Sequence, residues 1–346
     1  MAHATRRPRR AHRWPRRSLS VLQQLIFVGG AVCLILSSCG GSPSALDPHG
    51  PGAGKIATLW WILFAVAAVV FVIVMGSLFY ALFHRRRADA SRPVNANALV
   101  LVLGVIVPAI ILMVILVFAI NTESALSSAS TSANLTVEVV GHQWWWEVRY
   151  PDQQVATANE IHIPVGQTVQ VKLTADTVIH SFWVPQLQAK TDAFPGRTTT
   201  TWLKADVPGD YLGECAEFCG VQHANMALHV IADRPDQYDA WMKGQQQTPP
   251  QPTAPDLQKG YQVFIGASCS YCHTVRGTNA TANVGPDLTH LASRKTLAAG
   301  TIPNTPGNLA AWITSAQNIK PGNKMPSIYV NGDDLQALLI YLESLT

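Results

Sequence analysis

Charged residues are scarce in this sequence. They make up 13% of its 346 residues, whereas hydrophobic residues make up 48%. This balance indicates membrane segments in a chain long enough for two or three domains. The net charge is +4, but seven arginines among the first 17 residues supply it, and without them the chain carries −3. Because the net positive charge comes from the N-terminus alone, the sequence does not indicate nucleic acid as a partner.

Cysteine is also in short supply, and none is left over for a structural disulfide. Two of the six, Cys33 and Cys39, lie in or beside an N-terminal apolar run. The other four form two close pairs, Cys215 with Cys219 and Cys269 with Cys272. Each close pair belongs to a motif with other metal-binding side chains. Metal binding is therefore the first interpretation of both pairs.

Two long apolar runs contain no charged residue and no histidine. They cover residues 56–83 and 98–121. At about 1.5 Å rise per residue, each can cross the roughly 30 Å hydrocarbon core of a bilayer. Haem and copper sites inside a bilayer need histidine or charged ligands, so this chain is not expected to hold a metal site within the membrane.

The connection between the two runs predicts the orientation of the chain. Residues 84–97 contain four arginines and one acidic residue, Asp89. The positive-inside rule places this loop in the cytoplasm, so everything beyond residue 121 is expected on the extracytoplasmic side of a bacterial plasma membrane.

The N-terminus predicts the same orientation. A basic stretch, an apolar run and small residues indicate a secretory signal peptide over residues 1–38. Leu36-Ser37-Ser38-Cys39 also resembles the bacterial lipobox, so we expect lipidation at Cys39, followed by a tether over residues 39–55. An ordinary signal peptide with an incidental cysteine is the alternative.

The rest of the chain divides into two domains of different kinds. Residues 130–235 contain short β-rich runs without amphipathic helices between them, which predicts an all-β sandwich or barrel. A Pro- and Gln-rich linker follows at residues 244–256. Residues 257–346 are expected to form an all-α domain, because apolar residues recur at helical spacing near its end.

Four potential metal ligands lie within one stretch of twelve residues: Cys215, Cys219, His223 and Met226. Two thiolates four residues apart can bridge a pair of copper ions, and these soft donors suit copper. One further imidazole is then needed, and His180 is the candidate. A disulfide and a core role for His180 are the alternatives, but the joint spacing favours copper.

The second motif, Cys269-Ser270-Tyr271-Cys272-His273, is the attachment sequence of a covalent c-type haem. Cys269 and Cys272 would bind the haem covalently, and His273 would ligate its iron. Met325 is the only methionine after the motif, and we expect it to be the sixth ligand. His290 is the alternative.

Together these features resemble subunit II of the haem-copper oxidases, with its binuclear copper A centre. The matching stretches are residues 141–146, 180–185 and 190–197 and the first cysteine motif, and with the hairpin they cover roughly residues 56–235. Residues 257–346 resemble a class I cytochrome c domain. The whole chain resembles subunit II of a caa-type oxidase, in which a cytochrome c domain is fused to the C-terminus.

The resemblance implies a cupredoxin-like sandwich and a set of functional residues. Its copper A ligands would be His180, Cys215, Cys219, His223, Met226 and the backbone carbonyl of Glu217. The Glu217 side chain would reach a magnesium ion at the border with subunit I. Trp144 matches the electron-entry tryptophan of the family, with core packing as the alternative interpretation.

The resemblance also implies a function as an electron relay. Because the membrane runs lack metal ligands, the O2-reducing site is expected in another subunit. We expect electrons to pass from an external cytochrome c, through haem c and copper A, to haem a in subunit I of a proton-pumping cytochrome c oxidase. Subunits I and III are the expected partners, and the donor is cytochrome c or a quinol–cytochrome c reductase complex. An acidic outer surface would attract a basic donor.

Three other functions remain open. A copper A-containing nitric oxide reductase would use an equivalent electron-entry subunit. A nitrous oxide reductase is disfavoured because it is soluble and has a separate catalytic domain, and a copper chaperone would need neither six ligands nor a haem.

One departure from the family pattern is Leu101, which stands where many members have a glutamate that helps to admit protons. Proton entry is therefore not assigned to this chain.

Overall fold

The structure is a computed structural model that describes residues 43–83, 95–128, 133 and 135–346. The expected signal peptide, the lipidation site Cys39 and most of the arginine-rich connection lie outside the described residues. Residues Pro43–Thr346 belong to one structural unit.

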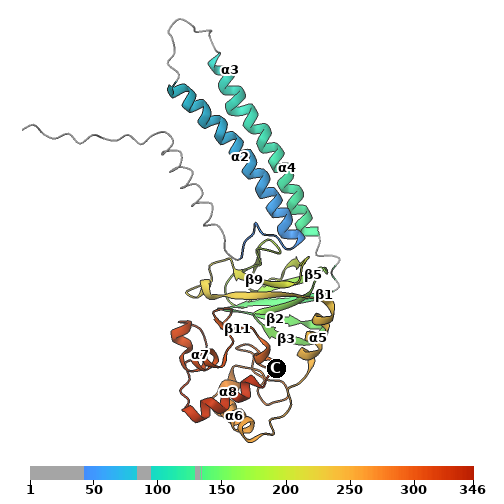
Figure 1. Cartoon of the computed structure of the whole chain (residues 1–346), viewed down its shortest axis with the longest axis vertical. Helices are drawn as coiled ribbons and strands as arrows, with labels where there is room; N and C mark the ends of the chain where they lie inside the picture. Colours follow the sequence, from blue (N-terminus) through green and yellow to red (C-terminus); the bar gives the residue numbers. More distant parts are fainter. Residues whose placement is uncertain (1–42, 84–94, 129–132, 134) are drawn as a thin grey trace, which may run out of the picture. The chain divides into compact units, whose positions relative to one another are not determined.

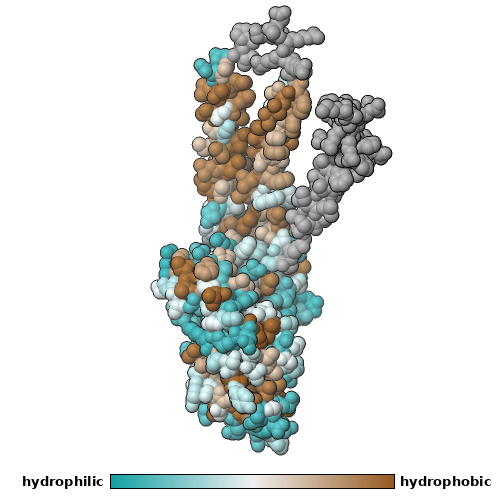
Figure 2. Space-filling view, turned by 90° about the vertical axis from the view of Figure 1, so that its left-hand side faces the viewer, coloured by the Kyte–Doolittle hydropathy of each residue, from teal (hydrophilic) through white to brown (hydrophobic). Residues whose placement is uncertain are grey.

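Two long helices form the expected hairpin. Helix α2 covers Pro51–Phe83, and the second helix consists of α3 (Ala96–Leu101), a π-helical segment (Val102–Ile106) and α4 (Val107–Ser128). Both are long and apolar enough to cross a membrane. Helices α2 and α4 lie side by side in Figure 1, and Figure 2 shows a largely hydrophobic surface on the hairpin.

Helix α2 begins within the segment that was expected to be a tether. Pro51 occupies its first turn, where the missing N–H costs no hydrogen bond. The preceding residues are held by backbone bonds, with His49 N donating to Gln186 O at 2.8 Å and Ala53 N donating to Leu187 O at 3.0 Å. The start of the helix is thus fixed by contacts with the β domain that the sequence alone does not reveal.

The β domain is a sandwich of two five-stranded sheets, as expected (Figure 1). The first sheet has the order β3-β2-β1-β5-β8, with strands Val155–Ala158, Trp145–Tyr150, Leu135–His142, Val169–Ala175 and Thr199–Leu203. The second has the order β4-β10-β9-β6-β7, with strands Glu160–Pro164, Ala227–Asp233, Gly209–Cys215, His180–Trp183 and Thr191–Ala193. Strand β1 pairs in parallel with β5, and β10 pairs in parallel with β4.

Alternating side chains of the two sheets build the core between them. Strands β1 and β5 bury every second residue, as expected of a sheet with one face on the core. Strand β4 is buried on both faces. Its second face is covered by helix α5 (Pro235–Gln246), whose Trp241 stacks on His162 at 3.9 Å between ring centroids.

The C-terminal domain is helical, as expected. Its elements are α6 (Pro255–Gly266), α7 (Pro306–Ile319) and α8 (Gly332–Glu343), with a two-stranded sheet of β11 (Thr296–Leu297) and β12 (Ile302–Pro303). Short 3-10 turns lie at Cys269–Tyr271 and Leu291–Ser293 in this domain, and at Pro151–Gln153 and His223–Asn225 in the β domain. Because α5 extends to Gln246 and α6 begins at Pro255, the linker between them is shorter than the expected 244–256.

Candidate metal centre and haem cavity

The loop between β9 and β10 carries most of the candidate copper ligands. Cys215 ends β9, and Met226 directly precedes β10. The base of the loop is closed by Cys215 N, which donates to Met226 O at 3.0 Å, and by Ala216 N, which donates to Ser181 O at 2.8 Å. The second bond places the loop beside the start of β6, where His180 lies. The structure thereby brings His180 to the loop across 35 residues of sequence.

The donor atoms of the six candidate ligands gather around the two thiols. The Sγ atoms of Cys215 and Cys219 are 3.8 Å apart. Around Cys215 Sγ lie His180 Nδ1 at 3.7 Å and Glu217 O at 3.3 Å. Around Cys219 Sγ lie His223 Nδ1 at 3.6 Å and Met226 Sδ at 3.9 Å. Two thiols with nitrogen and sulfur donors on each side fit a pair of copper ions.

The two cysteines are free thiols rather than a disulfide. The hydrogen bond between the two thiols lowers the pKa of Cys215 and raises the pKa of Cys219. The pairing therefore favours the loss of the first proton and opposes the loss of the second. Metal binding requires that the second proton also leaves.

His180 is held in a fully buried position by its neighbours. Its ring packs edge-on against Trp146 at 5.8 Å between centroids. Strand β1 passes close to its other side at Gly141, where a Cβ atom would lie 2.7 Å from His180 Cδ2. The histidine can occupy this place only because residue 141 has no side chain.

Trp144 is bound to the backbone of the copper loop. Its Nε1 donates to Cys219 O at 3.0 Å, and Gln143 Nε2 donates to the same carbonyl at 2.8 Å. The residue is 8% exposed. It also lies close to Gly220, where a Cβ atom would be 2.9 Å from Trp144 Cζ2. Trp144 therefore touches the backbone of one candidate copper ligand directly.

The haem motif lines a cavity of about 560 Å³ in the helical domain. Cys269, Cys272 and His273 all contribute to its wall. His273 Nδ1 donates to Pro286 O at 2.7 Å, which fixes the ring and leaves Nε2 free to ligate iron. Burial lowers the pKa of His273 and so favours the neutral form that a metal needs.

Met325 and His290, the two candidates for the sixth iron ligand, lie in different places. Met325 lines the cavity, and its loop is held by Gln317 Nε2, which donates to Met325 O at 2.7 Å. His290 lies outside the cavity lining. Its Nδ1 is 2.7 Å from Thr346 O, and its Nε2 is 3.1 Å from Gln245 O. The geometry favours Met325.

Two further polar groups fit the anionic propionates of a haem. Arg294 Nε and Thr296 Oγ1 are buried in the cavity wall and have no hydrogen-bond partner among the described residues. Burial of unpaired donors is costly, so a ligand that accepts from them is expected. The sequence motifs did not single out either residue.

The cavity wall also includes residues of the β domain. They are Gln143, Trp144, Trp145 and Asn159. Trp144 therefore borders the haem cavity and contacts the candidate copper loop at Cys219. The sequence suggested Trp144 for this position but not Trp145, which stacks on His142 at 4.4 Å between ring centroids.

Three family models match the chain. Residues 47–122 match the transmembrane domain and residues 153–232 the periplasmic domain of cytochrome c oxidase subunit II. Residues 257–346 match cytochrome c.

Named relatives extend over nearly the whole chain. Cytochrome c oxidase subunit 2 of Alkalihalophilus pseudofirmus is 36% identical, covering 90% of this chain and 94% of the relative. The protein of the same name from Bacillus sp. (strain PS3) is 30% identical, covering 93% and 97%. Among solved structures, the periplasmic domain of subunit II of cytochrome oxidase of Bradyrhizobium japonicum is 31% identical, covers 34% of this chain and 96% of its own, and has a TM-score of 0.33.

The three family-model matches agree with the observed order of hairpin, β-sandwich and helical domain. The matched domains imply copper A in the sandwich and haem c in the helical domain. The chain belongs to the cytochrome c oxidase subunit II family and carries a cytochrome c domain at its C-terminus.

Proposed function

We propose that this electron-transfer subunit of a terminal oxidase receives electrons at its own haem domain and passes them through copper A to another subunit. The haem would supply a one-electron acceptor close to the outer surface, and the copper pair a second acceptor with little change of geometry on reduction. The final acceptor is proposed to be O2 rather than nitric oxide, because the most similar relatives reported above are named cytochrome c oxidases.

The position of Trp144 carries this proposal. One side of the residue borders the haem cavity, and its Nε1 donates a hydrogen bond to Cys219 O. An electron leaving the haem cavity would therefore meet the copper loop after a single side chain. With only 8% of its surface exposed, Trp144 offers little area to an external protein. The donor is accordingly proposed to act on the haem domain.

Exposed residues at the start of the copper loop support the proposed exit. Phe218 is 76% exposed, and Glu217, which precedes it in the sequence, is exposed as well. Exposed apolar side chains next to a redox site are typical of a surface that another subunit covers. We place subunit I on this face, with Glu217 available to a magnesium ion at the shared border.

Removal of the haem attachment tests the route. In the purified oxidase complex, Cys269→Ala together with Cys272→Ala should abolish oxidation of an external cytochrome c while the copper content stays unchanged. A small artificial reductant that reaches copper directly should still support O2 consumption, which shows that the rest of the complex works. Full oxidation of cytochrome c by the variant would overturn the proposed entry at the haem.

A further inference from the structure

Lys320 is a buried lysine that connects the two extramembrane domains. It is 2% exposed. Its Nζ donates to Trp144 O at 2.8 Å, Asn225 O at 2.6 Å and Ala298 O at 2.7 Å. The first two carbonyls belong to the copper domain, and the third belongs to the haem domain. An ammonium group has three N–H donors, and each finds an acceptor here.

This arrangement requires the charged form of the side chain. Burial lowers the pKa of Lys320 to about 7. Three carbonyls around one nitrogen oppose this shift, because the neutral amine has only two N–H donors and would turn a lone pair toward an oxygen. Few lysines are buried at all, and those that are need such compensation.

The loop that follows Lys320 continues the contact as far as Met325. Gln222 Nε2 of the copper loop donates to Pro321 O at 2.8 Å. Gly322, with φ +82°, lies next to the Trp144 ring, and a Cβ atom there would be 3.8 Å from Trp144 Cη2. The segment that carries the candidate iron ligand therefore rests on the electron-entry tryptophan and on the copper loop.

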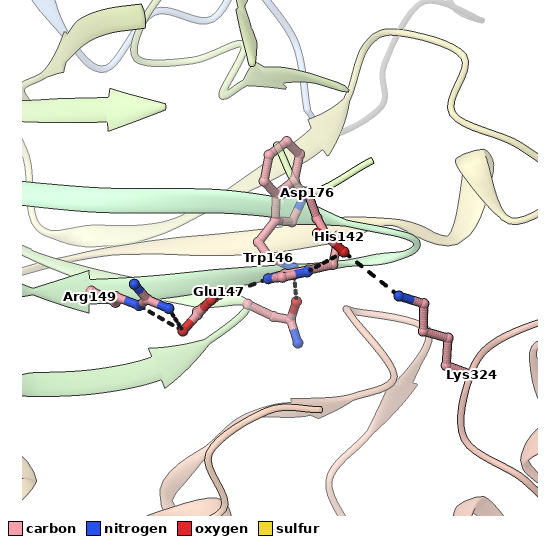
Figure 3. Close-up of polar contacts among 7 residues, drawn as sticks. His142, Trp146, Glu147, Arg149, Asp176 and Lys324 are labelled. Atoms are coloured by element: carbon pink, nitrogen blue, oxygen red, sulfur yellow. Dashed lines mark hydrogen bonds and ion pairs between the residues drawn. The ribbon is translucent and has the colours of Figure 1, made fainter. Parts of the chain in front are cut away.

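A second lysine of the same loop reaches the copper domain at the rim. Lys324 Nζ is 3.7 Å from Asp176 Oδ2, and their side chains are 56% and 42% exposed. Asp176 also faces His142, which contacts Glu147 (Figure 3). An exposed ion pair of this length contributes little to the stability of the contact between the domains and is screened by salt. The buried Lys320 therefore has the larger effect on how the domains fit together.

We propose that Lys320 is a positioning residue that seats the haem domain on Trp144 and so sets the rate of electron transfer from haem to copper. This inference rests on the proposed function. The three carbonyls come from three separate segments, so one ammonium fixes the haem domain relative to both Trp144 and the copper loop. Without it, the buried carbonyl of Trp144 and the carbonyl of Asn225 lose their donor, and the seated arrangement becomes less populated.

The test uses Lys320→Met in the complete oxidase complex, because methionine keeps the length of the side chain without its donors. Electron transfer from haem c to copper A should slow by about ten- to a hundredfold at every ionic strength, as expected when a buried ammonium group and its three hydrogen bonds are removed. Reduction of the haem by external cytochrome c should keep its rate, which a general folding defect would not allow. Hydrogen exchange of the segment around Trp144 should become faster.

Two lysines serve as matched controls. Lys324→Gln should slow electron transfer from haem c to copper A by less than about threefold, and only at low salt, because its partner is an exposed carboxylate. Lys259, paired with Asp334 at 3.0 Å within the haem domain, lies outside the contact, and Lys259→Gln should change nothing. If Lys320→Met does not assemble, Lys320→Gln, which keeps an amide donor, replaces it and should show the same loss in weaker form.

The outcomes separate the two proposals. A transfer rate within about twofold of the unmodified complex in Lys320→Met or its replacement would show that Lys320 does not position the domains. If haem c fails to reduce copper A even in the unmodified complex, the proposed function itself is wrong.

Discussion

Gly141→Ala gives a sharp test of the candidate copper site. The backbone at residue 141 accepts alanine, because its φ lies outside the left-handed region. The new Cβ atom would nevertheless lie 2.7 Å from His180 Cδ2 and 2.9 Å from its Cγ. Real Cβ contacts are longer, so the ring has to move. Because His180 is fully buried and packs against Trp146, there is no free space to receive it.

The expected cost follows from overpacking of a buried site. Such insertions destabilise a domain by about 1–3 kcal/mol, which lowers its unfolding temperature by several degrees. Displacement of the His180 ring should also lower the copper content, because its Nδ1 is placed 3.7 Å from Cys215 Sγ by the same packing. The haem domain should be unaffected, so haem iron can serve as an internal standard.

The assay is the ratio of copper to haem iron in the purified complex, together with thermal unfolding of the copper domain. The matched control is Gly244→Ala in helix α5, where a Cβ atom meets nothing within 4 Å. Alanine in that helix should be neutral or slightly stabilising. If Gly141→Ala kept the full copper content and unfolding temperature, the placement of His180 against β1 would be wrong.

Two further predictions concern stability. Gly260→Ala should destabilise the haem domain by about 3 kcal/mol, because its Cβ would lie 2.1 Å from Ala337 O where α6 crosses α8. Thermal unfolding with loss of the haem spectrum measures this, and Gly266→Ala, which meets nothing within 4 Å, is the control. Burial raises the pKa of Asp210, but hydrogen bonds from His229 and Lys295 outweigh it and lower the pKa to about 2. The stabilisation of the folded state by this cluster should be complete above the ordinary pKa of 3.8 and be lost as the pH falls toward 2. Asp210→Asn should therefore flatten this part of the plot of unfolding temperature against pH. A plot that the substitution leaves unchanged would contradict the prediction.

Local patterns in the sequence predicted the three kinds of domain correctly. Apolar runs of sufficient length predicted the hairpin, and alternation in residues such as 135–140 predicted strands that bury every second side chain. Pairing between strands was not predictable in the same way. The parallel pair of β1 and β5 depends on contacts between distant segments, for which a single sequence gives no pattern.

The candidate site divides along the same line. Cys215, Cys219, His223 and Met226 could be named from spacing, because one short loop carries them all. Lys320, Trp145, Arg294 and Thr296 could not, since their importance arises only where the two domains meet or where the cavity closes. The start of helix α2 and the end of helix α5 escaped prediction for the same reason, because contacts with other parts of the chain hold them.

The acceptors of Lys320 are all backbone carbonyls, and this has a genetic consequence. Ordinary substitution at residues 144, 225 or 298 changes a side chain and leaves the carbonyl oxygen in the chain. The contact that this ammonium group makes between the domains can therefore be lost directly by replacing a single codon, that of Lys320, whereas no single replacement of an acceptor removes it. A suppressor of a Lys320 variant would have to create a new contact elsewhere, since no reciprocal exchange of partners can restore the old one.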